Sequence, residues 1–148
     1  MTRTILLDSG PLGLVTNPRA SAPAAACGRW VVNEIARGAA VLVPEIADYE
    51  VRRELIRARR TAGIARLDAF IEQVEFLPIR TPAMRRAAAF WAEARREGRP
   101  TAPDPALDGD VILAAQAATL DRAGVIVATT NPRHLARYVA AELWTEIV

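Results

Sequence analysis

The chain has 148 residues, the size of one ordinary domain, and its 51% hydrophobic and 24% charged residues exclude an intrinsically disordered protein. Cys27 is the only cysteine, which excludes an intrachain disulfide and a thiolate zinc cluster. The net charge is +2 and the chain contains arginine but no lysine, a composition that is compatible with a polyanionic partner without requiring one.

Short apolar runs alternate with segments of helical periodicity along the chain. The apolar runs predict strands at 5–7, 41–43, 74–79, 125–128 and, near the end, within 140–148. Helices are predicted after Pro11 and at 24–37, 44–60, 64–73, 81–98 and 111–120. The proline-rich segment 99–105 is predicted to be a loop. This alternation predicts a single α/β domain over 1–148, with a mainly parallel central sheet covered by helices on both faces.

Nothing in the sequence indicates a membrane protein. No apolar run approaches the length needed to cross a bilayer, and the apolar stretch before Asp8 is too short for a signal peptide. We therefore expect a cytoplasmic protein with no membrane partner.

Polar side chains gather where strands of a parallel sheet would end, which is where open α/β sheets bind their ligands. These segments are Asp8-Ser9, Asp108-Gly109-Asp110 and Thr129-Thr130-Asn131. Glu50 is a further candidate because it lies at the border of the apolar stripe of its predicted helix. Carboxylates that converge on one site repel one another unless a cation neutralises them. With oxygen ligands only, Mg²⁺ or Mn²⁺ is the expected cation, and such ions activate water for attack on phosphodiesters.

Each of these acids also has a purely structural interpretation. Asp108 and Asp110 could cap the helix predicted at 111–120, because carboxylates accept hydrogen bonds from free N–H groups at a helix start. Glu50 could pair with Arg53 on a solvated helix face. His134 is a lone histidine for which packing or a surface hydrogen bond is the simpler expectation. Singly, the acids do not establish a site.

The ordered set of motifs is more specific than its members. The chain resembles the PIN-domain family, and especially its VapC-type toxin branch, through Leu7-Asp8-Ser9, Pro44-Glu45-Ile46-Ala47-Asp48-Tyr49-Glu50 with Glu54-Leu55, Asp108-Gly109-Asp110-Val111-Ile112-Leu113-Ala114-Ala115-Gln116-Ala117, and Ala128-Thr129-Thr130-Asn131-Pro132-Arg133-His134-Leu135. The resemblance extends from Thr4 to about Tyr138. It implies a PIN-like three-layer α/β/α sandwich.

The resemblance also implies a function, a metal-dependent endoribonuclease that is the toxin of a toxin-antitoxin pair. Asp8, Glu50 and Asp110 match the acidic residues that hold Mg²⁺ or Mn²⁺, with Asp108 as a supporting acid. Ser9 matches a polar companion of the first aspartate, and Asn131, with Thr129 two residues before it, matches the last polar position. Many relatives have aspartate where this chain has Thr130-Asn131, which leaves the number of metal ions open. The implied partners are RNA, a small antitoxin and a second copy of the chain.

Two other functions remain to be weighed. A PIN-like domain could bind RNA or a protein without cleaving it, because a fold alone does not establish activity. A phosphotransferase of the haloacid-dehalogenase type would need a second aspartate where this chain has Gly10, and a catalytic lysine that the chain lacks. The retention of Asp8, Glu50 and Asp110 favours the nuclease over the binding-only domain.

Overall fold

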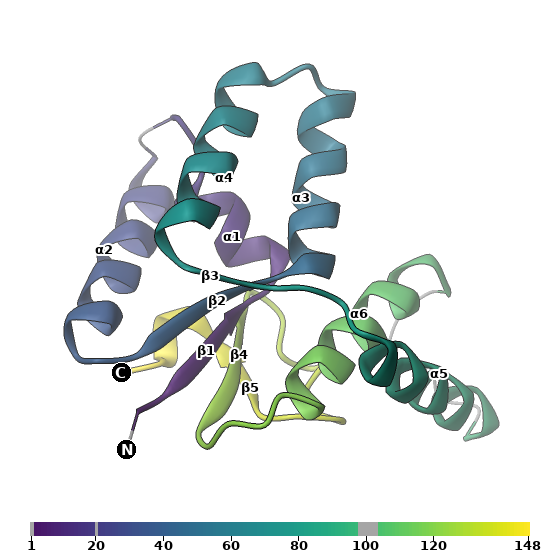
Figure 1. The fold of residues 1–148 in the computed structure, drawn as a ribbon. Coiled ribbons are helices and arrows are strands. Elements are labelled where there is room, and N and C mark those ends of the chain that lie inside the picture. Colours follow the sequence, from purple (N-terminus) through teal and green to yellow (C-terminus); the bar gives the residue numbers. More distant parts are fainter. Residues whose placement is uncertain (1, 20, 98–103) are drawn as a thin grey trace.

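The fold, in a computed structural model that describes residues 2–19, 21–97 and 104–148, is built on a five-stranded parallel sheet (Figure 1). The strand order is β3-β2-β1-β4-β5. The strands are β1 (Thr4–Leu7), β2 (Ala40–Pro44), β3 (Glu75–Leu77), β4 (Val125–Thr129) and β5 (Ala141–Leu143). The predicted parallel sheet is thereby confirmed, with β1 at its centre.

Helices connect the strands in the alternation that the sequence predicts. They are α1 (Ser9–Val15), α2 (Ala22–Ala36), α3 (Glu45–Arg57), α4 (Thr61–Gln73), α5 (Thr81–Arg96) and α6 (Asp104–Ala118), with a 3-10 turn at Trp144–Glu146 after β5. Parallel neighbours require such crossovers, because a tight turn can join only antiparallel strands.

The side chains of β1 alternate between two apolar layers. Ile5 and Leu7 pack on one face of the sheet, against Leu12 of α1, Val31 of α2 and Leu67 of α4. On the other face, Leu6 of β1 and Leu42 of β2 pack against Leu113 and Ala114 of α6. Every residue of β1 is buried, as expected for a central strand covered on both sides. The result is the predicted three-layer α/β/α sandwich.

The start of α6 differs from the prediction. The helix begins at Asp104 rather than at 111, so Asp108 and Asp110 lie within it and neither caps its first turn. Proline is tolerated in the first turn of a helix, where its missing N–H has no partner to lose, so Pro105 does not interrupt α6. The remainder of the predicted loop, 99–103, and the predicted end of α5 at Gly98 lie outside the described residues.

Other boundaries shift by a few residues. Pro44 and Arg80 flank the first turns of α3 and α5 as cap residues, so Thr81 is the first residue of α5 rather than its cap. The segment 140–148 contains only three strand residues before the 3-10 turn begins. Within the described ranges, no helix is long and apolar enough to cross a membrane.

Candidate functional site

Asp8 follows β1 directly, and its carboxylate accepts three hydrogen bonds, the longest of which, at 3.5 Å, runs from the Ser9 hydroxyl to Oδ1. Oδ1 accepts from the Ser9 backbone N–H at 2.7 Å, which makes Asp8 the cap of α1. Oδ2 accepts from the Thr129 hydroxyl at 2.7 Å. Thr129, 1% exposed at the end of β4, in turn accepts from the Asn131 backbone N–H at 3.1 Å. The ends of adjacent strands β1 and β4 thus fix the orientation of this carboxylate.

Gly10 lets the start of α1 lie against the segment after β4. A Cβ placed on Gly10 would come within 2.7 Å of the Thr130 Oγ1 and Cγ2 atoms, a distance that real Cβ atoms do not reach. The sequence marks Gly10 only as part of a turn, and the need for close approach becomes visible once β1 and β4 are known to be neighbours.

Glu50 reaches the site from α3, through a second close approach at a glycine. A Cβ on Gly109 of α6 would lie 2.8 Å from the Glu50 Oε2 atom. The Glu50 carboxylate therefore rests on the backbone of α6 beside Asp110. Helices α3 and α6, which are separated by about a third of the chain, together supply two of the predicted acids.

The electrostatics of Glu50 and Asp110 show that they share one environment with Asp8. The pKa of Glu50 is raised from 4.5 to about 7, first by burial and then by the charge of Asp8, with Arg53 acting in the opposite direction and Asp110 adding a smaller increase. The pKa of Asp110 is raised from 3.8 to about 6 by burial and then by Asp8, while His134 lowers it. Both shifts indicate carboxylates that are partly desolvated and insufficiently neutralised.

No arginine forms an ion pair with Asp8, Glu50 or Asp110 within the described ranges. Arg53 and His134 act on the centre electrostatically, without a salt bridge. We refer to Asp8, Glu50 and Asp110 as the acidic centre. It is a concentration of negative charge that the described part of the chain leaves largely uncompensated.

His134 is a residue of this region whose position the sequence does not reveal. Its charge acts on Asp110, and its buried Nδ1 atom has no hydrogen-bond partner among the described residues. A lone histidine in a sequence carries no periodicity or spacing signal, so only the placement of the segment after β4 identifies it.

Two predicted residues stand apart from the acidic centre. Asp108 is exposed and lines a groove between α5 and α6 with Met84 and Trp91, and it does not contribute to the pKa shifts of Glu50 or Asp110. A step of two residues along a helix rotates the side-chain direction by about 200°, which explains why Asp108 and Asp110 point to different sides of α6. Asn131 is exposed, and its contact with the site is through its backbone N–H.

The donor chemistry of the acidic centre fits a hard divalent cation. In the described ranges, no group of three or more His, Cys, Asp and Glu side chains already has the geometry of a metal-binding cluster. Mg²⁺ does not need one, because it keeps several waters and binds through one or two carboxylates. Asp8, Glu50 and Asp110 are the residues that would hold the ion, since they supply oxygen atoms and uncompensated charge.

Comparisons with known proteins identify similar folds. No family model and no curated protein sequence matches the chain. Among solved structures, the chain is similar to one in the crystal structure of VapBC2 from Rickettsia felis bound to a DNA fragment from their promoter, with 12% identity, a TM-score of 0.69, and 95% of this chain and 98% of that chain covered.

Two further structures show the same likeness. DNA-bound VapBC from Salmonella typhimurium gives 22% identity and a TM-score of 0.65, and FitAcB from Neisseria gonorrhoeae gives 20% identity and a TM-score of 0.69. Each comparison covers 97% of this chain and 99% of the other. The chain therefore has the PIN-like α/β fold, over nearly its whole length, as its sequence motifs predict.

Proposed function

We propose that this chain is a metal-dependent endoribonuclease, and that it is the cytoplasmic toxin of a toxin-antitoxin pair. The observation that carries the proposal is the acidic centre, in which the carboxylate that follows β1 and those of α3 and α6 influence one another and have no arginine partner in the described ranges. A nuclease needs such uncompensated charge to hold Mg²⁺ or Mn²⁺, whereas a binding-only domain gains nothing from it.

The residues of the site have different roles in the proposed reaction. Asp8, Glu50 and Asp110 would hold the cation, and the chemistry that it would supply there is activation of water and stabilisation of charge at the phosphodiester. Thr129 and the Ser9 backbone N–H orient the Asp8 carboxylate. At neutral pH Glu50 is partly protonated without the cation, so its proton must leave before it can serve as a ligand.

Cleavage of RNA tests the proposal. Purified protein is incubated with a single-stranded RNA in Mg²⁺, in Mn²⁺ and in EDTA, alongside Asp8→Asn and a control, Asp121→Asn, at an exposed aspartate outside the centre. We expect cleavage by the parent and the control in either metal, and none in EDTA or by Asp8→Asn. Cleavage that persists in EDTA would overturn the proposal, and RNA binding without cleavage would favour the non-catalytic alternative.

The antitoxin and the homodimer are part of the same proposal. The similar structures are named as VapBC and FitAcB assemblies, which supports a small protein partner for this chain. We expect an antitoxin encoded by the neighbouring reading frame to co-purify with the chain and to suppress cleavage. Light scattering of the purified chain should give the mass of a dimer, and a monomer at high concentration would count against that part.

A further inference from the structure

A cleft of about 870 Å³ opens beside the acidic centre. Its lining comes from α1, the segment after it, α3, the turn between α3 and α4, and the start of α4. Ser9 and Glu50 line it, so the cleft is continuous with the acidic centre. Figure 1 shows α3 and α4 rising side by side from the sheet with α1 at their base, away from α5 and α6.

Four arginines line the cleft, namely Arg19, Arg53, Arg59 and Arg60. None of them forms an ion pair with a carboxylate in the described part of the chain. Glu54 also lines the cleft, but Arg57 already neutralises it at 2.8 Å. Beyond Glu50, the cleft therefore presents positive charge that no carboxylate of the described ranges neutralises.

The backbone at Arg59 adds an independent observation. Helix α3 ends with the Arg59 N–H donating to the Ile56 carbonyl and the Arg60 N–H to the Leu55 carbonyl, and Arg59 has φ +54°. This is the Schellman ending, whose left-handed position favours glycine. Helix α2 ends with the same pair of hydrogen bonds, and there the residue is Gly38, with φ +91°.

Arg59 is thus an exception in this chain. Among the described residues it is the only non-glycine residue with a positive φ. Strained backbone of this kind persists where a side chain is needed, and it gathers at functional sites. An arginine at the tip of the hairpin, in place of the glycine that the motif prefers, indicates a requirement for its guanidinium.

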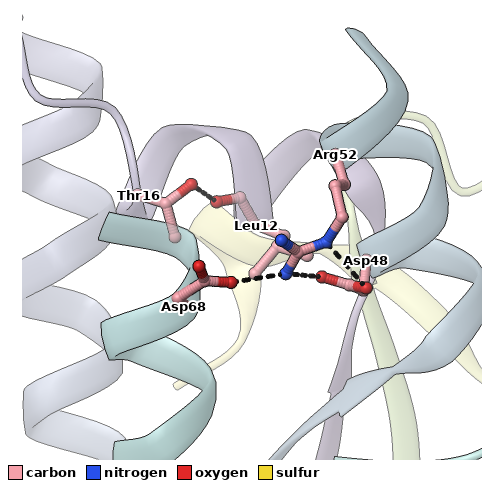
Figure 2. Close-up of polar contacts among 5 residues, drawn as sticks. All are labelled: Leu12, Thr16, Asp48, Arg52 and Asp68. Atoms are coloured by element: carbon pink, nitrogen blue, oxygen red, sulfur yellow. Dashed lines mark hydrogen bonds and ion pairs between the residues drawn. The ribbon is translucent and has the colours of Figure 1, made fainter. Parts of the chain in front are cut away.

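Helices α3 and α4 form a helical hairpin that carries Arg53, Arg59 and Arg60, and two contacts fix these helices against each other. Arg52 of α3 bridges Asp48 of the same helix and Asp68 of α4, at 2.9 and 2.8 Å, as Figure 2 shows. Gly63 allows α4 to approach α3, since a Cβ there would lie 2.8 Å from the Leu55 Cδ2 atom. The positive wall of the cleft is therefore preorganised, which reduces the entropy lost when a ligand binds.

We infer that this cleft binds the sugar-phosphate backbone of single-stranded RNA next to the scissile bond, an inference that rests on the proposed function. Arginine recognises phosphate through its planar donors, and positively charged grooves follow the backbone of single strands without reading their sequence. An acidic peptide is the competing ligand. It is disfavoured because Asp8, Glu50 and Asp110 would repel its carboxylates, whereas a scissile phosphodiester there would share the cation with these acids.

The test uses Arg59→Gly and Arg60→Gln, with Arg85→Gln on the exposed surface of α5 as the matched control. Each is made in an Asp110→Asn background, so that a labelled single-stranded RNA stays intact while its affinity is measured in Mg²⁺ at several salt concentrations. We expect each cleft variant to weaken binding roughly two- to fivefold. The slope of log affinity against log salt should fall by about 0.7 for each phosphate that the variant no longer neutralises. Arg85→Gln should change neither.

Arg59→Gly separates binding from folding. Because glycine suits the left-handed position, the melting temperature of this variant should equal or exceed that of the parent, while its affinity for RNA falls. Unchanged RNA affinity in both cleft variants would overturn the inference, as would weakened binding of a poly-glutamate peptide with RNA affinity unaffected. If the unmodified chain cleaves no RNA while the cleft variants still lose RNA affinity, the proposed nuclease fails and the binding cleft stands.

Discussion

The protein contains two clusters of carboxylates that differ in whether an arginine pairs with them. One is the acidic centre, and the other is the Arg52 bridge, formed by Asp48, Arg52 and Asp68. Asp48 and Asp68 lie on neighbouring helices, and Arg52 between them forms an ion pair with each (Figure 2). Asp8, Glu50 and Asp110 also come from separate elements, yet no arginine pairs with them in the described ranges. At the Arg52 bridge, the chain itself supplies the cation that pairs with the acids.

The contrast indicates that the acidic centre is arranged for a cation from outside. Burial, and after it the charge of Asp8, raises the pKa values of Glu50 and Asp110. At the bridge, the pKa of Arg52 is raised, first by its hydrogen bond to Asp48, so that the pair is stable as a charged unit. The first cluster destabilises the protein without its ligand and the second stabilises it.

Removing one acid from the centre should have the largest effect. For Asp110→Asn we expect RNA cleavage to fall by at least about 100-fold, because a ligand of the cation is lost. In EDTA the variant should be as stable as the parent or more stable, by roughly 1–2 kcal/mol near pH 8, since the raised pKa of Asp110 reports unfavourable ionisation. Thermal melts in EDTA and in Mn²⁺, with a cleavage assay, measure both effects.

The position of Asp110 in α6 sharpens this expectation. An anion favours the first turn of a helix, but Asp110 lies beyond the first turn of a helix that begins at Asp104, so little helix-dipole stabilisation is lost with it. Mn²⁺ at a hundredfold excess over its dissociation constant should stabilise the parent by about 2.7 kcal/mol, and Asp110→Asn much less. A variant that melts well below the parent in EDTA, yet keeps its Mn²⁺ response and its cleavage, would show that Asp110 is structural.

The pH dependence of stability without metal should come next in size. Unfolded Glu50 loses its proton near pH 4.5, whereas in the folded protein it keeps the proton until about pH 7. Between these values the folded state binds more protons, so the free energy of unfolding should fall as pH rises, by roughly 2 kcal/mol. Asp110 acts in the same direction between its ordinary pKa and about 6. Urea unfolding in EDTA from pH 4.5 to 8 measures the fall.

Glu50→Gln is the control for this pH dependence. It should flatten most of the decline, because it removes the group with the larger shift. A parent that gains stability across the same interval in EDTA would contradict the pKa assignments.

Breaking the Arg52 bridge should act on stability alone. Arg52→Gln removes both ion pairs and leaves Asp48, whose side chain is 16% exposed, without its cation, so we expect a loss of about 1–2 kcal/mol in urea unfolding. At a temperature where the variant is folded, its affinity for Mn²⁺ should match the parent. A selective loss of metal binding with normal stability would mean that the two clusters are not separate.

Asp108→Asn should have the smallest effect. Asp108 lies on the α5 side of α6, so we expect cleavage within about twofold of the parent and a change in stability within about 0.5 kcal/mol. The cleavage assay that compares it with Asp110→Asn tests the supporting role that the family resemblance implies. A loss of cleavage as large as that of Asp110→Asn would show that Asp108 belongs to the site.

The sequence predicts the sheet well because its strands are apolar runs between clear turns. Ile5, Leu6 and Leu7 are buried on both faces, and such strands have no polar alternation to misread. The start of α6 could not be predicted, because Pro105 is compatible with both a loop and a first helical turn. That error put Asp108 and Asp110 together at the start of the helix, whereas both lie inside α6, where helical geometry separates them.

The sequence motifs predict the acids of the site. Its other contacts depend on which helices and strands pack together in the fold. The contact of Gly109 with Glu50 depends on how α3 and α6 pack, which no local pattern encodes. The same holds for His134, which follows β4 and acts on Asp110 only through the tertiary fold. The left-handed backbone of Arg59 could not be predicted for another reason: in a sequence, the end of a helix is usually recognised by a glycine, and α3 ends without one.

Direct titration with Mn²⁺ tests the central claim, that the acidic centre is built to receive a cation from outside. Calorimetry of the parent, Asp110→Asn and Asp48→Asn at pH 6 and pH 8 measures how many ions bind and how tightly. We predict saturable binding by the parent that strengthens from pH 6 to pH 8 as Glu50 loses its proton, similar binding by Asp48→Asn, and at least tenfold weaker binding by Asp110→Asn. Equal Mn²⁺ binding by the parent and Asp110→Asn, or no saturable binding by the parent, would contradict the claim.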